Sequence, residues 1–296
     1  MVEAAPTSRA HTAGLTATAL VAFAANSILC RLALGGGAID AASFTTVRIV
    51  SGAMALVLVG RLHRGPIAPG GGTWTEAFLL FLYAVAFSFA YRSLSAGTGA
   101  LILFSSVQIT MMVAGLRSGE RPAPRVWAGW LLGLGGVVGL VLPGLTAPSA
   151  PGAALMGLAG AAWGFYSLRG RGANDPVAAT RGNFARAVVP ALCVSLICRP
   201  AMHGSTRGIA LAALSGAAAS GLGYVLWYAA LRGLTATRAA IVQLAVPALL
   251  ATAGVLFLSE SVSLRLFGSA TAIMGGVAMA VLGRSPTPIP RPAEPA

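Results

Sequence analysis

The sequence predicts an all-α integral membrane protein with ten transmembrane helices arranged as two inverted five-helix repeats. The 296 residues are 56% hydrophobic and only 9% charged, with a mean hydropathy of +0.81, which leaves too little charge to cover a soluble domain. At about 20 apolar residues per crossing, the chain has room for about ten spans and no separate soluble domain. The later parts of the two halves also match each other at a fixed offset.

Apolar runs separated by Gly, Pro and Arg define the expected helices. In chain order they span about 13–34, 41–60, 74–95, 98–117, 125–143, 152–169, 179–199, 208–231, 235–258 and 264–283. The expected domains are a tail at 1–12, a first repeat at 13–145, a second repeat at 150–284 and a tail at 285–296. The alternative for the first run is a signal peptide cleaved near Ala22-Phe23-Ala24, but cleavage there would cut the first helix in half.

The charge pattern predicts the orientation in the membrane. All 20 Lys or Arg positions are Arg and seven residues are acidic, giving a net charge of +13. The arginines lie between apolar segments, so they indicate topology and no nucleic-acid partner is expected. With ten spans, 13 arginines fall on the side of both termini and 6 on the other. The positive-inside bias therefore predicts a multi-pass protein of the bacterial cytoplasmic (inner) membrane with both termini cytoplasmic.

The internal repeat is visible in charged residues and glycine pairs. An offset of 140 places Arg92 on Arg232, Glu120 on Glu260, Arg125 on Arg265, and Gly135-Gly136 on Gly275-Gly276, and an offset of 138 places Arg31 on Arg169 and Arg48 on Arg186. Because five helices is an odd number, the second half must enter the membrane from the opposite side. Inverted repeats of this kind are typical of transporters that work by alternating access. The alternative is that duplication produced only a stable bundle.

The repeated residues also carry a family resemblance. The matching stretches are Leu231-Arg232-Gly233-Leu234-Thr235-Ala236, Val246-Pro247-Ala248, Leu258-Ser259-Glu260, Gly275-Gly276-Val277, and, in the first half, Arg48 and Gly119-Glu120. Together they resemble the drug/metabolite transporter (DMT) superfamily, specifically its ten-helix EamA family, over residues 13–284. The resemblance implies export or exchange of amino acids and related small metabolites through a central cavity. A Trp common in the first helix of the family is absent near Asn26, although Trp163 stands at the related place in the sixth helix.

Polar and aromatic side chains at membrane depth are the candidates for a transport pathway, because they are costly there without a role or a partner. Tyr83 and Phe87 share one helix face, as do Tyr224 and Trp227, so an aromatic cavity is predicted. An interfacial belt is the alternative for Tyr91, Trp227 and Tyr228. The full set of substrate-pathway candidates is Asn26, Tyr83, Phe87, Gln108, Trp163, Tyr166, Tyr224, Trp227 and Gln243.

Several of these polar residues have two interpretations. Gln108 and Gln243 either hold the amino and carboxylate groups of a zwitterion or tie two helices together by a hydrogen bond. Pro247 predicts a kink in the ninth helix, acting as a hinge or a static bend. Arg48 and Arg186 either contact the anionic end of a substrate or cap backbone carbonyls and snorkel, and the structural role is favoured.

Loop charges and missing motifs limit which mechanisms and which kinds of site the sequence predicts. Two ion pairs are expected in the loops, Glu120 with Arg125 and Glu260 with Arg265. Since no Asp or Glu falls near the centre of an expected helix, facilitated export or exchange is expected and not obligatory proton antiport. The three cysteines form no ligand pattern, and no enzyme motif is found, so no disulfide, catalytic residue, cofactor or metal is expected.

The sequence therefore predicts a transporter, not an enzyme. It is expected to export amino acids, aromatic or otherwise apolar, and related small metabolites. Its expected partners are membrane lipid and a small-molecule substrate, and it is expected to act as a monomer. The alternatives are an efflux carrier for amphipathic drugs or another metabolite class and, from a different class, a channel or membrane scaffold.

Overall fold

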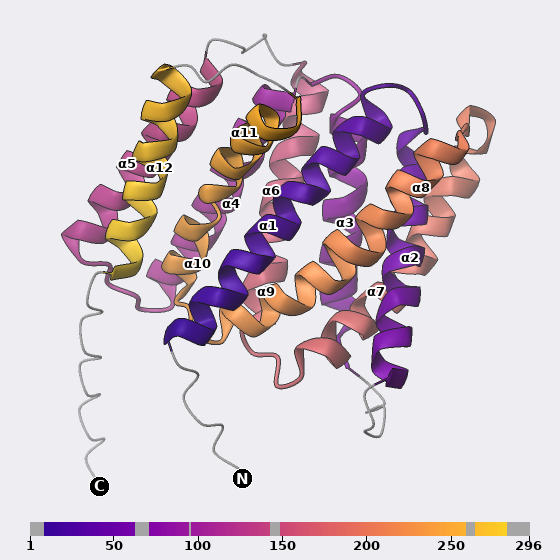
Figure 1. Ribbon diagram of the computed structural model, residues 1–296. Coiled ribbons are helices and arrows are strands. Elements are labelled where there is room, and N and C mark those ends of the chain that lie inside the picture. The colour runs from indigo at the N-terminus through magenta and orange to yellow at the C-terminus, as the bar shows by residue number, and fades with distance from the viewer. Residues whose placement is uncertain (1–8, 63–70, 95, 143–148, 259–263, 283–296) are drawn as a thin grey trace, which may run out of the picture.

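The computed structural model describes residues 9–62, 71–94, 96–142, 149–258 and 264–282, which form an all-helical bundle (Figure 1). Its helices are α1 (Arg9–Leu34), α2 (Ala41–Leu62), α3 (Trp74–Ala90), α4 (Ala96–Arg117), α5 (Pro124–Val141), α6 (Ala150–Gly170), α7 (Pro176–Ile197), η2 (Arg199–Ala201), α8 (Thr206–Leu214), η3 (Ser215–Leu222), α9 (Gly223–Leu231), α10 (Ala236–Val242), α11 (Ala245–Leu258) and α12 (Leu264–Leu282). An isolated antiparallel bridge pairs Ile39 with Gly204.

The helices correspond to the ten predicted spans, with two corrections inside them. The eighth span is not uniformly α-helical, because its middle eight residues, η3, form a π-helix. The ninth span is not continuous either, since Gln243 and Leu244 separate α10 from α11. The first span was predicted to start at residue 13, but α1 already begins at Arg9.

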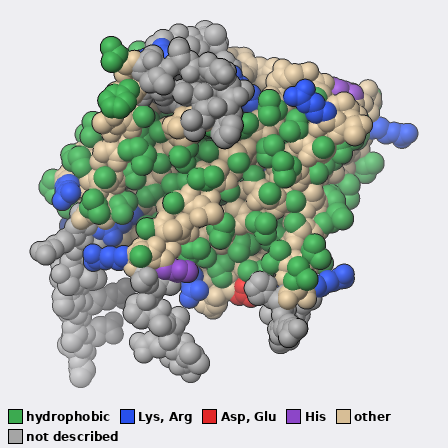
Figure 2. Space-filling view, viewed as in Figure 1, with side chains coloured by type: hydrophobic (Ala, Val, Ile, Leu, Met, Phe, Trp, Pro, Cys, Tyr) green, Lys and Arg blue, Asp and Glu red, His purple; other side chains and the backbone are tan. Residues whose placement is uncertain are grey.

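Helix length and hydropathy fit a membrane protein. Within the described residues, four helices are long and apolar enough to cross a membrane: Arg9–Leu34, Ala41–Leu62, Gly99–Arg117 and Thr206–Leu231. Trp74–Ala90, Ala236–Leu250 and Phe267–Leu282 are shorter apolar helices. Hydrophobic side chains cover much of the middle of the face shown in Figure 2, and Arg side chains lie toward its edges.

We call the end of the bundle where α1 begins the amino end, and the end where α1 finishes at Leu34 the far end.

The helix starts are set by local capping. Thr73, Ser149, Asp175, Ser205 and Thr235 each accept hydrogen bonds from backbone N–H groups of the first turn that follows. A side-chain acceptor there satisfies donors that have no partner inside the helix. The last described helix, α12, ends at the amino end, where α1 begins (Figure 1).

Helices of the first half pack mainly on helices of the second half. The packed pairs include α1 with α9 and α11, α3 with α6 and α7, α4 with α6 and α10, α2 with α7 and η3, and α5 with α12. The α5–α12 pair stands at one side of the bundle (Figure 1). A small cluster that includes Val126, Ile241, Leu244 and Ile273 joins this pair to the α10–α11 break. The larger core lies between the remaining helices and holds the aromatic residues.

The π-helix η3 lies in backbone contact with α2. A Cβ at Gly216 would collide with the carbonyl of Arg48, and a Cβ at Gly52 would collide with the Phe184 ring and come close to the Gly216 carbonyl. Glycine at these positions allows the close approach, as small residues do between membrane helices. The sequence pattern gives no warning of η3, because Gly and Ala are equally compatible with an ordinary α-helix.

Candidate functional site

Aromatic rings from four helices meet in the middle of the bundle. Trp163 of α6 is the hub, with ring centroids 4.7 Å from Tyr224, 5.1 Å from Tyr83 and 5.2 Å from Phe23. Phe87 lies one turn from Tyr83 on α3, 5.6 Å away between centroids. The predicted aromatic faces of α3 and α9 therefore do turn toward each other, with α6 and α1 completing the cluster.

The cluster borders a small cavity to which both halves of the chain contribute. Its lining residues are Phe23, Asn26, Ser27, Tyr83, Phe87, Leu103, Phe104, Val107, Trp163, Tyr224, Gln243 and Val246. The cavity volume is about 30 Å³. Sites for small molecules usually have about 300–1,000 Å³. In this conformation the cavity is therefore too small by about a factor of ten to hold a metabolite.

Six of the predicted pathway residues line this cavity: Asn26, Tyr83, Phe87, Trp163, Tyr224 and Gln243. Sequence reasoning missed the apolar lining from α4, the residues Phe23 and Ser27 of α1, and Val246 of α11. Phe23 is a lone aromatic in an Ala-rich helix, so no periodic pattern marks it. Its contact with Trp163 depends on which helices are neighbours, and a single sequence does not give that.

The other three predicted pathway residues, Gln108, Tyr166 and Trp227, do not line the cavity. Trp227 is fully buried and donates its indole N–H to Ser167 Oγ at 3.0 Å, so it belongs to the packed interior and not to an interfacial belt. Tyr228, another belt candidate, is also buried and donates its hydroxyl to the Tyr166 carbonyl at 3.2 Å. Tyr166 contacts Trp163, Tyr224 and Tyr228, and its own hydroxyl has no partner.

The two glutamines both form hydrogen bonds near the break between α10 and α11. Gln108 donates from Nε2 to the Ala240 carbonyl at 2.6 Å, and its Oε1 has no partner. Gln243 accepts the indole N–H of Trp163 at 2.7 Å and donates to the Ala239 carbonyl at 2.9 Å. Gln243 thus connects the break directly to the aromatic hub, whereas Gln108 ties α4 to α10.

Pro247 accounts for the position of the break. Proline has no N–H to donate to the residue four positions earlier, which is Gln243, and its ring clashes with that carbonyl. The Gln243 carbonyl instead accepts the Val246 N–H at 3.1 Å, and Leu244 donates to Ile241 at 3.0 Å. The interruption therefore lies one turn before the proline, at the depth of the cavity, so Gln243 can be both a cap and part of the cavity wall.

Arg48 is buried beside the cavity, with 1% of its surface exposed. Its Nε donates to Ser220 Oγ at 2.9 Å and its Nη2 to the Tyr224 hydroxyl at 2.6 Å, while Nη1 has no partner. The guanidinium carbon lies 5.3 Å from the centre of the Tyr83 ring. A charge at the centre of a membrane helix costs about 2.5–3.5 kcal/mol on insertion scales. Among the described residues, the contacts of this arginine are with neutral hydroxyls and aromatic faces.

Arg186 has a different environment, although the sequence offset of 138 aligns it with Arg48. Its Nη1 donates to the carbonyls of Gly71 at 2.9 Å and Gly182 at 3.0 Å, and its guanidinium lies 5.9 Å from the centre of the Trp74 ring. These contacts hold the segment before α3 against α7 at the amino end. Of the two interpretations made from sequence, carbonyl capping describes Arg186.

Asn26 links α1 to the π-helix. Its Oδ1 accepts the Ser215 hydroxyl at 2.6 Å, and the Cys30 thiol lies 3.9 Å away. Together with the Arg48–Ser220 bond, this places two hydroxyls of η3 in contact with polar residues of the first half. The π-helix is therefore the segment that joins the polar groups near the cavity.

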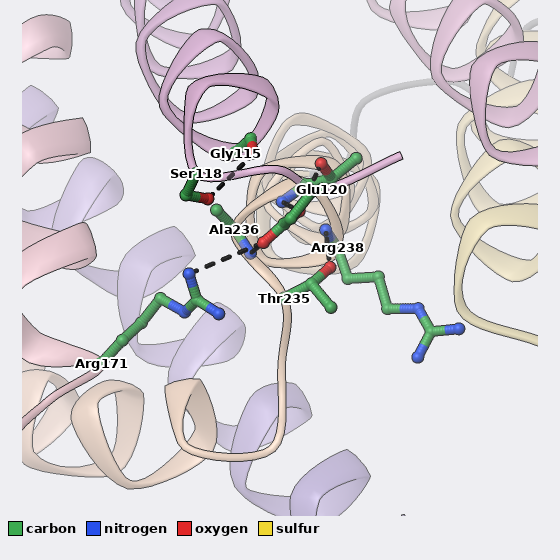
Figure 3. A network of polar contacts seen from close by, with 8 residues as sticks. Gly115, Ser118, Glu120, Arg171, Thr235, Ala236 and Arg238 are labelled. Atoms are coloured by element: carbon green, nitrogen blue, oxygen red, sulfur yellow. Dashed lines mark hydrogen bonds and ion pairs between the residues drawn. The ribbon is translucent and has the colours of Figure 1, made fainter. Parts of the chain in front are cut away.

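A carboxylate closes the amino end. Glu120 accepts the backbone N–H groups of Ala236 at 2.7 Å and Thr237 at 3.0 Å, and the Thr237 hydroxyl at 2.7 Å. Its ion-pair partner is Arg171, at 3.7 Å, and not the predicted Arg125 (Figure 3). We call Glu120, Arg171, Ala236 and Thr237 the amino-end latch. The predicted Glu260–Arg265 pair lies outside the described residues, because Glu260 does.

The turn before Glu120 explains why its carboxylate reaches the start of α10. Gly119 has φ +87°, a left-handed conformation that favours glycine, and it follows the last turn of α4. The Glu120 N–H donates to the Gly115 carbonyl and the Gly119 N–H to the Leu116 carbonyl, which is the Schellman pattern of a helix end. This turn directs the carboxylate to the start of α10, where the helix dipole favours a negative charge.

Environment shifts the pKa of the carboxylates at both ends. Burial raises the pKa of Glu120, but hydrogen bonds from Thr237 and Ala236 and the charge of Arg171 outweigh it and hold the pKa below its ordinary value. Burial also raises the pKa of Asp40 at the far end, where hydrogen bonds from Ser43, His203 and Ala42 lower it overall. Both groups are therefore ionised near neutral pH.

The far end is closed by backbone contacts between the halves. Asp40 donates its N–H to the His203 carbonyl at 3.0 Å, and its carboxylate accepts the His203 N–H at 2.8 Å. Ser205 donates its N–H to the Ala38 carbonyl at 2.7 Å. These bonds flank the Ile39–Gly204 bridge. Contacts between the first and second halves thus lie at both ends of the bundle, on either side of the central cavity.

Comparison with known proteins agrees with this architecture. The model of the EamA-like transporter family matches residues 150–282. A Pseudomonas aeruginosa protein, described as uncharacterized, is 51% identical over 274 residues, covering 91% of this chain and 94% of that protein. The chain belongs to the EamA-like transporter family. This confirms the resemblance to the EamA family of the DMT superfamily and makes the chain a multi-pass membrane transporter.

A solved crystal structure shares the fold of this EamA-like transporter. It has a TM-score of 0.77 and 20% sequence identity, and the alignment covers 93% of this chain and 98% of that one. Since the identity is low, the likeness concerns the fold alone. In this EamA-like transporter, side chains of both halves meet at the central cavity.

Proposed function

We propose that this transporter exports amino acids with aromatic or other apolar side chains, and related small metabolites, through the central cavity by alternating access. The observation that carries the proposal is the composition of the cavity wall. Aromatic rings of Tyr83, Trp163 and Tyr224 face uncharged polar groups of Asn26 and Gln243. This lining suits a small molecule with an apolar body and a polar end.

We infer that the two halves form an inverted repeat. The matches at offsets of 138 and 140 support this, and so does the helix packing. Exchanging the first five spans with the last five turns the α3–α6 contact into the α1–α9 contact, α4–α6 into α1–α11, and α2–η3 into α3–α7. Two similar bundles of opposite orientation are suited to exposing a shared site to each side in turn.

A conformation with a small central cavity and contacts at both ends fits an intermediate of such a cycle. Opening the amino-end latch would expose the cavity to one side, and opening the Ile39–Gly204 contact would expose it to the other. The excess of arginines on the side of both termini favours the cytoplasm of a bacterial inner membrane at the amino end. The described acidic residues lie at or near helix ends, which supports facilitated transport without an obligatory proton.

A second candidate is efflux of amphipathic drugs. The apolar residues Leu103, Phe104 and Val107 in the cavity wall favour it, because they would accept a larger apolar body. The two functions differ in whether the substrate must carry the amino and carboxylate groups of an amino acid. A substrate panel that contains both amino acids and amphipathic drugs distinguishes them.

The test is counterflow of labelled amino acids into proteoliposomes of the purified transporter. We expect saturable uptake of aromatic or large apolar amino acids, reduced at least about tenfold in Ser27→Phe because the new ring fills the cavity. Val21→Phe is the matched control on α1, since Val21 is 56% exposed on the outer face and should transport normally. Uptake of drugs alone would favour the second candidate, and conductance that does not saturate would contradict a carrier.

A further inference from the structure

The guanidinium of Arg48 is a buried cation without a carboxylate partner. The described acidic residues are Asp40, Glu76, Glu120 and Asp175, and all of them lie at helix ends or in the first helical turn. Ion pairs join Glu76 to Arg169 and Glu120 to Arg171. Within the described chain, the region around the cavity thus carries one fixed positive charge that no side-chain carboxylate balances.

Arg48 is separated from the cavity by one layer of side chains. Three residues that it touches, Tyr83, Phe87 and Tyr224, line the cavity on their other side. Movement of the Tyr224 hydroxyl would therefore expose the guanidinium to the cavity. The cavity must enlarge to take up any metabolite, and the rings around Arg48 form part of the wall that has to move.

The present partners of Arg48 are replaceable. Ser220 and Tyr224 are neutral hydroxyl acceptors, and Nη1 has no acceptor. A carboxylate forms stronger, charge-assisted bonds with a guanidinium and can engage two of its nitrogens at once. An anion entering the enlarged cavity would supply both the missing acceptor and the missing negative charge.

We propose that Arg48 is the binding group for the carboxylate of the transported molecule, and that the carrier accepts aromatic and apolar monocarboxylates whether or not they bear an amino group. The proposal rests on the proposed transport through the central cavity and defines its substrate class by the carboxylate. An ammonium group finds no side-chain carboxylate among the described lining residues and is repelled by Arg48. The carboxylate is therefore the required group, and the ammonium is dispensable.

The first experiment compares four probes of one size in thermal-shift titrations of the purified transporter. They are 3-phenylpropionate, phenylalanine, phenylalaninamide and phenethylamine, with sodium chloride at matched concentration as the inorganic-anion arm. We expect both acids to bind at least about tenfold more tightly than the amide or the amine, the effect of one charge-assisted hydrogen bond. Equal protection by chloride would overturn recognition of a carboxylate.

Variants test whether Arg48 causes this discrimination. Arg48→Gln should abolish the preference for acids, while Tyr224→Phe should strengthen acid binding because it frees Nη2 from its hydroxyl acceptor. Arg186→Gln is the matched control, since this arginine bonds to backbone carbonyls at the amino end and should leave the ratio of acid to amide unchanged. If Arg48→Gln does not fold, the opposite shift in Tyr224→Phe still decides the question.

Uptake of the same probes into proteoliposomes separates this proposal from the proposed function. Transport of phenylalanine and of its amide at equal rates would overturn the role of Arg48 and leave amino-acid transport standing. Transport of 3-phenylpropionate without phenylalanine would support Arg48 and overturn amino-acid export. Transport and binding of none of the probes would overturn both.

Discussion

Trp163 shows how a single side chain can couple the cavity to the backbone. Its ring packs on Phe23, Tyr83 and Tyr224, and its N–H bonds to Gln243 at the break between α10 and α11. The sequence could place Trp163 on a membrane helix, but not opposite Gln243. That pairing depends on the arrangement of helices. A single sequence shows the periodicity of each helix but not which helices are neighbours.

Replacing Trp163 with Phe should therefore destabilise the protein beyond the loss of ring area. The change leaves the buried Gln243 oxygen without its donor, at a cost of about 1–3 kcal/mol. Trp130→Phe is the matched control, because the buried indole N–H of Trp130 has no partner to lose. Thermal or denaturant unfolding in detergent measures the difference. Equal stability of the two variants would contradict a structural role for the Trp163–Gln243 bond.

Glu120 shows the limit of reading ion pairs from sequence distance. Arg125 lies near it in the chain, but the Schellman turn at Gly119 directs the carboxylate toward the start of α10 and Arg171. The Gly-Glu pair could be recognised from sequence as a repeated motif. Its role as a cap for a helix of the other half could not, because the cap joins segments that are distant in sequence.

The pH dependence of Glu120→Gln tests this contact. Since the pKa of Glu120 is lowered in the folded protein, its stabilisation is complete above its ordinary value of 4.5 and is lost as pH falls through the folded pKa. Glu120→Gln should thus lower stability by about 1 kcal/mol at neutral pH and converge with the parent in acid. Glu76→Gln, at a pair whose Arg169 is half exposed, should change little. A difference that is the same at all pH values would contradict the latch.

At the scale of elements, local signals set the helix starts and long-range contacts set the irregularities. Apolar runs separated by Gly, Pro and Arg are sufficient to predict the ten spans, and Ser, Thr and Asp caps mark where several of the helices begin. Pro247 predicts a bend in the ninth span, but the sequence did not place it at Gln243. The π-helix η3 has no local signal, because its geometry accompanies the close approach to Gly52 and the bonds to Asn26 and Arg48.

The pair Gly275-Gly276 offers a matched test of how α12 packs on α5. A Cβ at Gly276 would collide with the backbone of Gly129 and Gly133 on α5, whereas a Cβ at Gly275 would meet only the end of Leu132, at 3.9 Å. Gly276→Ala should therefore separate α5 from α12 and lower the unfolding temperature. Gly275→Ala should be neutral or slightly stabilising, since alanine favours helix more than glycine. Comparable loss in both variants would show that the α5–α12 contact does not depend on this close approach.

At the scale of the whole molecule, alternating access requires the contact at each end to break in turn. The far-end contact can be locked with a disulfide in Ile39→Cys/Gly204→Cys. Opposite residues of an antiparallel pair have Cα atoms about 4.5–5.5 Å apart, and disulfides span about 4.4–6.8 Å. A Cβ at Gly204 would lie 3.4 Å from Ile39 Cγ1, so the new side chains would face each other. Cys193→Ser and Cys198→Ser remove the accessible native thiols.

The oxidised double-cysteine protein should lose transport and recover it with a reductant, while either single cysteine should transport normally. Because the amino-end latch remains free to open, the locked protein should still bind substrate in a thermal-shift titration. Binding without transport would place the block in the second half of the cycle, after entry from the amino end. Transport at the parental rate, with the disulfide verified by mass, would mean that the halves need not separate at Ile39 and Gly204.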